Sequence, residues 1–136
     1  MREILFRGKR KDNGEWVEGD LLQDKDLEKC YIEYFDYCSG ENGLEREYCQ
    51  CEVIPETVGQ FTGLIDKNGK KIFEGDIVQH DFGAEQIGVQ YAVVEYDSKY
   101  ASFMIKPLYD WMYCEKDDCE VIGNIQDSPN FWEGGY

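Results

Sequence analysis

The stretch Ile65–Gln79 reads I-D-K-N-G-K-K-I-F-E-G-D-I-V-Q, and a weaker copy, K-D-N-G-E-W-V-E-G-D-L-L-Q, occupies Lys11–Gln23. Each copy has Asn-Gly, a few mixed residues, and then Glu-Gly-Asp followed by two aliphatic residues and Gln. Asn-Gly is typical of a type I′ hairpin turn, and a glycine inside a strand marks a bulge or a sharp bend. The sequence therefore predicts two related β-units, each a tight turn followed by a strand that bends at Gly19 or Gly75.

Aromatic and β-branched segments on both sides of these motifs predict further strands. The predicted strands are Glu3–Gly8, Glu15–Gln23, Cys30–Tyr37, Tyr48–Ile54, Ile72–Gln79, Val89–Asp97, Ala101–Lys106 and Cys119–Ile125. The alternation of Val89–Asp97 changes phase, which predicts a bulge near Val94. Strands of this length between Gly-rich turns are typical of a small barrel or barrel-like sheet.

Two segments between the strands carry different signals. Ser39–Glu47 contains two glycines and an asparagine, which predicts a mobile loop. Pro107–Tyr113 begins with proline and predicts a short helix. No segment has the periodicity of a long helix, so we expect a mainly β protein with little helix.

The net charge of −15 argues against ordinary nucleic-acid binding, because an acidic surface repels phosphate backbones. Two interpretations stay open, a soluble acidic protein or a decoy that mimics nucleic acid and occupies a basic protein's site. The acids are scattered singly, which weakens the decoy interpretation. Arg7–Lys11 is a short basic run and is predicted to be a solvated turn that pairs with acids of the sheet.

The chain carries no run of about 18 apolar residues, and its first residues become charged too soon for a signal peptide. We therefore expect a cytoplasmic protein. Without a secretory signal, the six cysteines are expected to be free buried thiols, and their spacings do not fit the paired C-x₂-C knuckles of zinc ribbons.

No catalytic residue, metal ligand or cofactor site is predicted. A metal-dependent enzyme using Glu74, Asp76 and His80 is an alternative, but a repeated Glu-Gly-Asp favours a structural device used twice. The residues predicted to build the fold motif are Gly63, Asn68, Gly69, Glu74, Gly75 and Asp76.

Four segments resemble the YopX family, small proteins of bacteriophages and prophages in Gram-positive bacteria. They are F-R-G-K at Phe6–Lys9, P-E-T-V-G-Q-F-T-G-L at Pro55–Leu64, D-K-N-G-K-K-I-F-E-G-D-I-V at Asp66–Val78, and V-I-G-N-I at Val121–Ile125 followed by Ser128-Pro129. The resemblance does not extend to Asp24–Cys51 or Asp81–Gln90. It implies an SH3-like β-barrel and a phage setting, and it supplies no activity and no catalytic residue.

The expected organisation is an additional N-terminal β-unit over residues 1–54 and an SH3-like barrel unit over residues 55–136, within one shared globule. The predicted function is that of a non-enzymatic accessory protein that binds a phage or host protein. SH3-like barrels bind through loops and sheet edges, so the candidate surface is the Cys30–Tyr37 strand, with Tyr31, Tyr34 and Tyr37, and the loop after it. Homo-oligomerisation through aromatic strands and a nucleic-acid-related role are alternatives.

Overall fold

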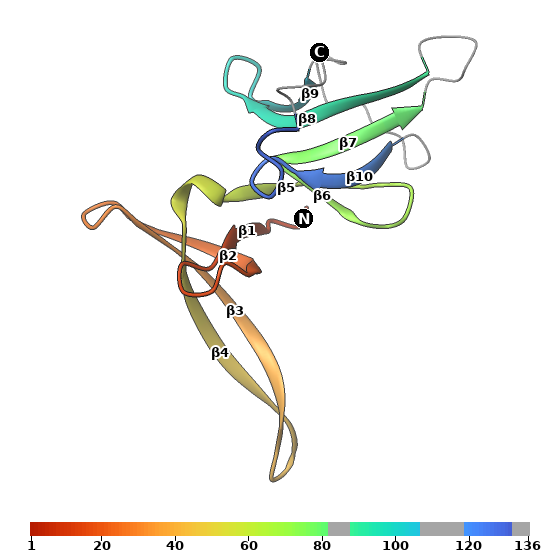
Figure 1. Ribbon diagram of the computed structural model, residues 1–136. Helices are drawn as coiled ribbons and strands as arrows, with labels where there is room; N and C mark the ends of the chain where they lie inside the picture. The colour runs from red at the N-terminus through yellow and green to blue at the C-terminus, as the bar shows by residue number, and fades with distance from the viewer. Residues whose placement is uncertain (82–87, 107–118, 132–136) are drawn as a thin grey trace. The chain divides into compact units, whose positions relative to one another are not determined.

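The computed structural model describes residues 1–81, 88–106 and 119–131 (Figure 1). Its described residues form ten strands and one short 3₁₀ helix, which confirms the prediction of a mainly β protein. The chain divides into two compact units, residues 1–60 and residues 61–136, whereas the sequence analysis placed the boundary after residue 54. The strands pair into antiparallel sheets, and the SH3-like barrel stays a prediction.

The first unit is a sheet in which neighbouring strands are antiparallel, with the order β4-β3-β2-β1-β5. Its elements are β1 (Phe6–Lys9), β2 (Trp16–Asp24), β3 (Lys29–Gly40), β4 (Gly43–Val53), the 3₁₀ helix η1 (Pro55–Thr57) and the start of β5 (Gly59–Ile65). Ile32 and Val53 are fully buried in this unit.

Gly19 is the point at which β2 changes its partner. The residues up to Gly19 pair with β1, and those from Asp20 onward pair with β3. A Cβ atom on Gly19 would lie 2.2 Å from the carbonyl oxygen of Glu33, so only glycine permits this approach of the two backbones. The predicted bend at Gly19 therefore corresponds to a change of pairing partner.

The second unit contains the pair β5-β6 and a four-stranded sheet of order β10-β7-β8-β9. Its elements are β6 (Lys71–Phe73), β7 (Asp76–Asp81), β8 (Val89–Asp97), β9 (Ser102–Lys106) and β10 (Cys119–Asn124). The buried core of this unit consists of Ile72, Val78, Ala92, Val94, Ile105, Cys119 and Val121. Strand β8 has the predicted bounds.

The single bent strand predicted over Ile72–Gln79 is wrong. The chain forms β6 and then β7, separated by a turn in which Gly75 has φ of +91° and donates its N–H to the Val94 carbonyl at 2.8 Å. Strand β6 pairs with β5, and β7 pairs with β8 and β10. Both copies of Glu-Gly-Asp thus lie where the chain changes pairing partner, although one is inside a strand and the other in a turn.

The type I′ turns predicted at the two Asn-Gly pairs are also wrong. Gly14 and Gly69 have positive φ, of +73° and +80°, but Asn13 and Asn68 do not. In the second copy, Asp66 N–H donates to the Lys70 carbonyl and Gly69 N–H donates to the Asp66 carbonyl, a three-residue loop that needs positive φ only at its last residue. The first copy has one more residue in its loop.

The predicted loop Ser39–Glu47 is almost entirely strand. Strand β3 continues to Gly40, β4 begins at Gly43, and only two residues lie between them. The glycines and the asparagine belong to the tip of this hairpin, and the residues around the tip continue the β ladder.

Three further predictions concern the C-terminal half. The bulge predicted near Val94 is wrong, because the pairings of β8 continue in register through that residue. Register shifts lie instead between Val121 and Gly123 of β10 and between Phe61 and Ile65 of β5. Cys119 is disulfide-bonded, so the expectation that all six cysteines are free thiols is wrong. An argument from the redox state of the cellular compartment does not consider which cysteines the fold brings together. The helix predicted over Pro107–Tyr113 lies outside the described residues.

Candidate interaction surface

The longest hairpin of the first unit extends beyond its sheet. Strand β2 pairs with Lys29–Glu33 of β3, and from residue 34 to the tip the described pairings of β3 are with β4 alone (Figure 1). We call residues 34–48 the arm. Most of its residues are exposed, so the arm is a two-stranded ribbon with two faces open to solvent.

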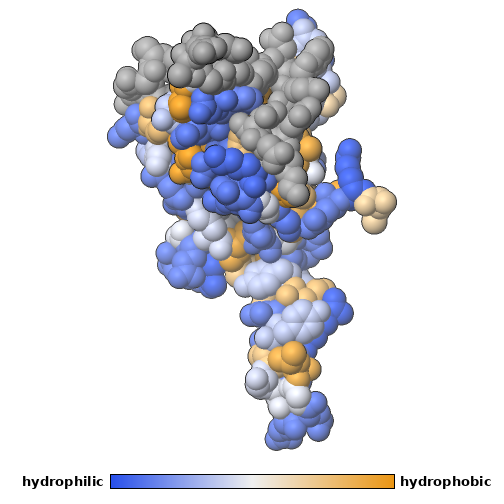
Figure 2. Space-filling view, turned by 90° about the vertical axis from the view of Figure 1, so that its right-hand side faces the viewer, coloured by the Kyte–Doolittle hydropathy of each residue, from blue (hydrophilic) through white to orange (hydrophobic). Residues whose placement is uncertain are grey.

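One face of the arm is aromatic and apolar. The register sets Phe35 opposite Tyr48, Tyr37 opposite Arg46 and Ser39 opposite Leu44, and these three pairs share one face because side chains alternate along a strand. Phe35, Tyr37, Leu44 and Tyr48 are 50%, 64%, 76% and 53% exposed. We call this surface the aromatic face; hydrophobic residues are visible on the narrow lower part of Figure 2, which the hairpin forms.

Contacts within the aromatic face hold its side chains in place. The Phe35 and Tyr48 rings meet edge to face with centroids 5.7 Å apart, and the Arg46 guanidinium lies 3.5 Å from the Phe35 centroid. Glu33 and Gln50 form the next cross-strand pair on this side toward the base of the hairpin, and the Glu33 carboxylate accepts a hydrogen bond from Gln50 Nε2 at 3.0 Å. A hydrogen bond to Glu33 also raises the pKa of Tyr48, with smaller contributions from burial and the Glu33 charge.

The opposite face of the arm is acidic. Asp36 lies directly opposite Glu47, and Cys38 lies opposite Glu45, with Tyr34 and Cys49 nearer the base. Burial and the negative charges of Glu47 and Asp36 raise the pKa of Cys49. This thiol therefore stays protonated and is a poor nucleophile. Like charges directly opposite each other destabilise a sheet, so this acidity reduces the stability of the isolated arm.

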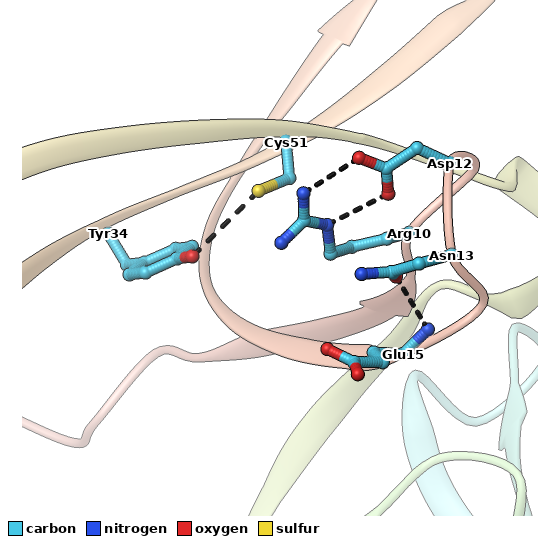
Figure 3. A network of polar contacts seen from close by, with 6 residues as sticks. All are labelled: Arg10, Asp12, Asn13, Glu15, Tyr34 and Cys51. Carbon is cyan, nitrogen blue, oxygen red and sulfur yellow. Dashed lines mark hydrogen bonds and ion pairs between the residues drawn. The ribbon is translucent and has the colours of Figure 1, made fainter.

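A groove of about 340 Å³ lies at the base of the arm and is lined by Arg10, Lys11, Asp12, Gln50, Cys51 and Glu52. Its cations are already paired. Arg10 donates to both carboxylate oxygens of Asp12, at 3.0 and 2.7 Å (Figure 3). The Lys11 ammonium lies 3.1 Å from the Glu52 carboxylate. The hydrogen bond from Arg10 lowers the pKa of Asp12, and that from Lys11 lowers the pKa of Glu52.

The rest of the basic run is engaged as well. The Arg7 guanidinium and the Lys9 ammonium lie 4.8 Å and 5.5 Å from the Trp16 ring centroid. The solvated turn predicted over Arg7–Lys11 is wrong for Arg7–Lys9, which belong to β1, and the turn begins only at Lys11. The predicted pairing with an acid of the sheet is confirmed for Lys11, whose partner Glu52 belongs to β4. A basic run whose charges are paired in this way is a weak site for phosphate.

Tyr34 contacts Cys51, a lining residue of this groove, and does not belong to the aromatic face. Its hydroxyl and the Cys51 thiol are 3.8 Å apart and share a hydrogen bond in which either atom can donate. This contact, together with burial, raises the pKa of Tyr34 to about 12, so the phenol stays protonated at neutral pH.

The three tyrosines predicted for the interaction surface do not lie on one face. Tyr31 and Tyr37 lie on the same side of β3, but only Tyr37 belongs to the aromatic face of the arm, and Tyr34 points to the other side. The predicted set omitted Phe35, Leu44 and Tyr48, the other large side chains of this face. Leu44, Arg46 and Tyr48 alternate along one strand. Interpreting Ser39–Glu47 as strand would therefore have placed Leu44 and Tyr48 on the same face.

The fold-motif residues have structural roles in the second unit. Gly63, Gly69 and Gly75 have positive φ, Asn68 donates its side-chain amide to Glu120 at 3.3 Å, and Glu74 lies in the turn between β6 and β7. The buried Asp76 accepts a hydrogen bond from Phe73 N–H at 2.7 Å. Across residues 1–81, 88–106 and 119–131, no three His, Cys, Asp or Glu side chains form a group that could hold a metal, so Glu74, Asp76 and His80 are not assembled into one.

Within the described part of the chain, no helix is both long enough and apolar enough to cross a bilayer. The fold and the exposed arm define a mainly β protein that presents an aromatic β-ribbon. The family model described as YopX protein matches residues 5–133, and the chain therefore belongs to the YopX family.

Among solved structures, the crystal structure of protein EF1440 from Enterococcus faecalis is similar, with a TM-score of 0.61 and 25% sequence identity. The alignment covers 95% of this chain and 97% of that chain. A comparison with curated proteins found no match.

Proposed function

We propose that this protein is a non-enzymatic accessory protein of phage or prophage origin that binds another protein in the bacterial cytoplasm through the aromatic face of its arm. The observation that supports the proposal is the exposure of four large apolar side chains on one face of a two-stranded ribbon. Contiguous exposed apolar surface in a soluble protein marks an interaction site.

The composition of the face fits a protein partner. Tyrosine, phenylalanine and arginine are enriched at protein interfaces, and they supply large contact areas at a small entropic cost. Phe35 already contacts both Tyr48 and Arg46, so a partner meets a surface that is largely preformed. A ribbon of two strands is marginally stable in water by itself, and a partner that covers one face would stabilise it.

The same surface does not suit nucleic acid. Arg46 is the single basic residue of the arm, against the acids Asp36, Glu41, Glu45 and Glu47. Stacking platforms for single strands combine aromatic side chains with a positively charged groove, and this arm has the opposite charge.

The proposal also includes the fold of residues 55–136, for which the family resemblance implies an SH3-like barrel.

The test is affinity capture of the tagged protein from a phage-carrying host, with nuclease present, read by mass spectrometry. Tyr37→Lys and Leu44→Lys place a charge on the aromatic face, and Cys38→Lys places the same charge on the opposite face at the same level of the ribbon. We expect one stoichiometric partner with the wild type and with Cys38→Lys, and its loss with both aromatic-face variants.

Two results would contradict the proposal. The first is a partner that all four proteins capture equally, which would place the binding surface elsewhere. The second is a complex that disappears on nuclease treatment, which would favour a nucleic-acid-related role.

A further inference from the structure

Strand β4 forms one edge of its sheet, because the order of strands ends there and its eleven residues pair with β3. At the base of the hairpin, the residues Lys9–Lys11 lie along the other side of β4. Lys11 N–H donates to the Glu52 carbonyl at 3.0 Å, and Ile54 N–H donates to the Lys9 carbonyl at 2.9 Å. One end of this edge therefore already accepts an added strand, which the chain itself supplies.

The pairing at the base shows which backbone groups of β4 point outward. In an antiparallel strand the N–H and C=O groups of successive residues point alternately to the two sides. The Glu52 carbonyl points away from β3, and the register of β4 continues to the tip without a shift. The residues of the arm and its base that share this direction are Leu44, Arg46, Tyr48 and Gln50.

This part of the edge is open in the described structure. Across residues 1–81, 88–106 and 119–131, no strand or loop pairs with the outward backbone groups of residues 44, 46, 48 and 50. A row of unpaired N–H and C=O groups is a template for another strand, and proteins often protect such edges with proline or lysine. Strand β4 contains neither residue, so the edge is available for pairing.

The acidic face of the arm selects the charge of an added strand. Glu45 and Glu47 are the acids of β4 on this face, and they lie next to the open edge. Basic side chains of an added strand would lie opposite them, with Cβ atoms about 5 Å apart, where opposite charges stabilise a sheet. A second copy of the chain would instead bring a further Glu45 and Glu47 to this face, and like charges on neighbouring strands destabilise a sheet.

The aromatic face selects apolar residues at the alternate positions. Leu44 and Tyr48 are the large apolar side chains of β4 on this face, and they are 76% and 53% exposed. Between them, the Arg46 guanidinium lies 3.5 Å from the ring centroid of Phe35, which belongs to β3. Its charge is therefore held toward β3 rather than over the open edge. Apolar side chains of an added strand would extend the aromatic face.

From these features we propose that the partner contributes an extended segment of alternating basic and apolar residues, which pairs as a strand with the open edge of β4. The inference rests on the proposed function and names the chemistry of the partner. In this mode of recognition, main-chain hydrogen bonds supply affinity and alternate side chains supply specificity. The groove of about 340 Å³ beside Gln50 and Glu52 leaves room at the base for the end of the added strand.

The test is amide hydrogen exchange of the purified full-length chain, followed by NMR, with a probe peptide of about ten residues in which lysine alternates with valine. With the peptide in excess, the amides expected to exchange at least about tenfold more slowly are those of Leu44, Arg46, Tyr48 and Gln50. The amides of Glu45 and Glu47, which point toward β3, should not change. A peptide with glutamate in place of lysine should protect none of these amides.

Two variants test the selection by charge. Glu47→Lys sets a lysine opposite Asp36, so the ribbon gains a favourable pair, but the variant should bind the lysine peptide at least about fivefold more weakly. Asp26→Lys makes the same charge change at an exposed position in the β2–β3 turn and should alter the affinity by less than about twofold.

Three results would overturn the inference. The first is a lysine peptide that does not bind, or that binds without protecting the four outward amides. The second is protection of these amides in the protein alone as its concentration rises, which would assign the edge to a second copy. The third is equal weakening by Glu47→Lys and Asp26→Lys. None of them would contradict the proposed function, which Tyr37→Lys tests on β3, away from this edge.

Discussion

At the scale of single residues, Asp66 is a buried carboxylate that joins two elements of the second unit. It is 1% exposed, and it accepts hydrogen bonds from three backbone N–H groups: Asn68 and Lys70 at Oδ1 and Val121 at Oδ2, each at 2.9 Å. The first two bonds shape the Asn-Gly loop, and the third joins that loop to β10. Asp66 was not among the residues that the sequence analysis selected.

Asp66→Asn should lower the free energy of unfolding by about 2–3 kcal/mol, because it removes the charge and presents an NH₂ group to a backbone donor. Urea denaturation followed by fluorescence measures this change. Asp26→Asn, at an exposed position in the β2–β3 turn, is the control and should alter stability by less than about 0.5 kcal/mol. Equal stability of Asp66→Asn and the wild type would show that these bonds contribute little.

The same carboxylate makes stability depend on pH. Burial opposes its ionisation, but the three N–H donors outweigh burial and hold the pKa of Asp66 below its usual value of 3.8. A lowered folded-state pKa contributes stability that is present above the unfolded pKa and is lost as the pH falls through the folded pKa. The stability difference between the wild type and Asp66→Asn should therefore be constant near neutral pH and shrink below about pH 4. A difference that grew on acidification would contradict this assignment.

At the scale of elements, the two copies of Glu-Gly-Asp place a glycine where the chain changes its hydrogen-bonding partner. In the first unit the change occurs inside β2, and in the second it occurs between β6 and β7. The glycine is needed for different reasons, a close backbone approach at Gly19 and a positive φ at Gly75. A sequence repeat can thus conserve the position of a topological change without conserving its local conformation.

Gly19→Ala should destabilise the first unit by about 1–3 kcal/mol, because the added Cβ would overlap the Glu33 carbonyl and force β2 and β3 apart. Gly123→Ala is the matched control, since a Cβ atom there would meet no heavy atom within 4 Å. Thermal unfolding of the two variants measures the difference. An equal loss of stability in both variants would show that the close approach to Glu33 does not explain the requirement for glycine at position 19.

At the scale of the whole molecule, two features predict that the protein does not bind nucleic acid. They are the net charge of −15 and the paired cations of the basic run. A labelled DNA duplex titrated with this protein should show no change in fluorescence anisotropy, even at about 50 mM salt, where electrostatic binding is strong. Binding that weakened as salt rose and disappeared in a Lys9→Ala, Lys11→Ala double variant would contradict this expectation. It would restore the nucleic-acid hypothesis.

Much of the β architecture could be predicted because its signals are local. Alternation and β-branched residues located Val89–Asp97 and the strand beginning at Cys119, and Asn-Gly located both turns. The arm was missed because glycine, asparagine and serine near a hairpin tip are also the composition of a loop. The eleven cross-strand pairs between β3 and β4, which include those of the arm, are visible only when the two strands are set side by side.

The sequence by itself determined the β class, the family, the acidic surface and the positions of the turns, since each depends on residue type and short-range spacing. Only the tertiary structure decided which residues share a face, where β2 changes partner, and that Asp66 joins a loop to a strand 55 residues away. These features depend on pairing register, and a shift of one residue moves every side chain of a strand to the other face. The aromatic face of the arm follows from that register.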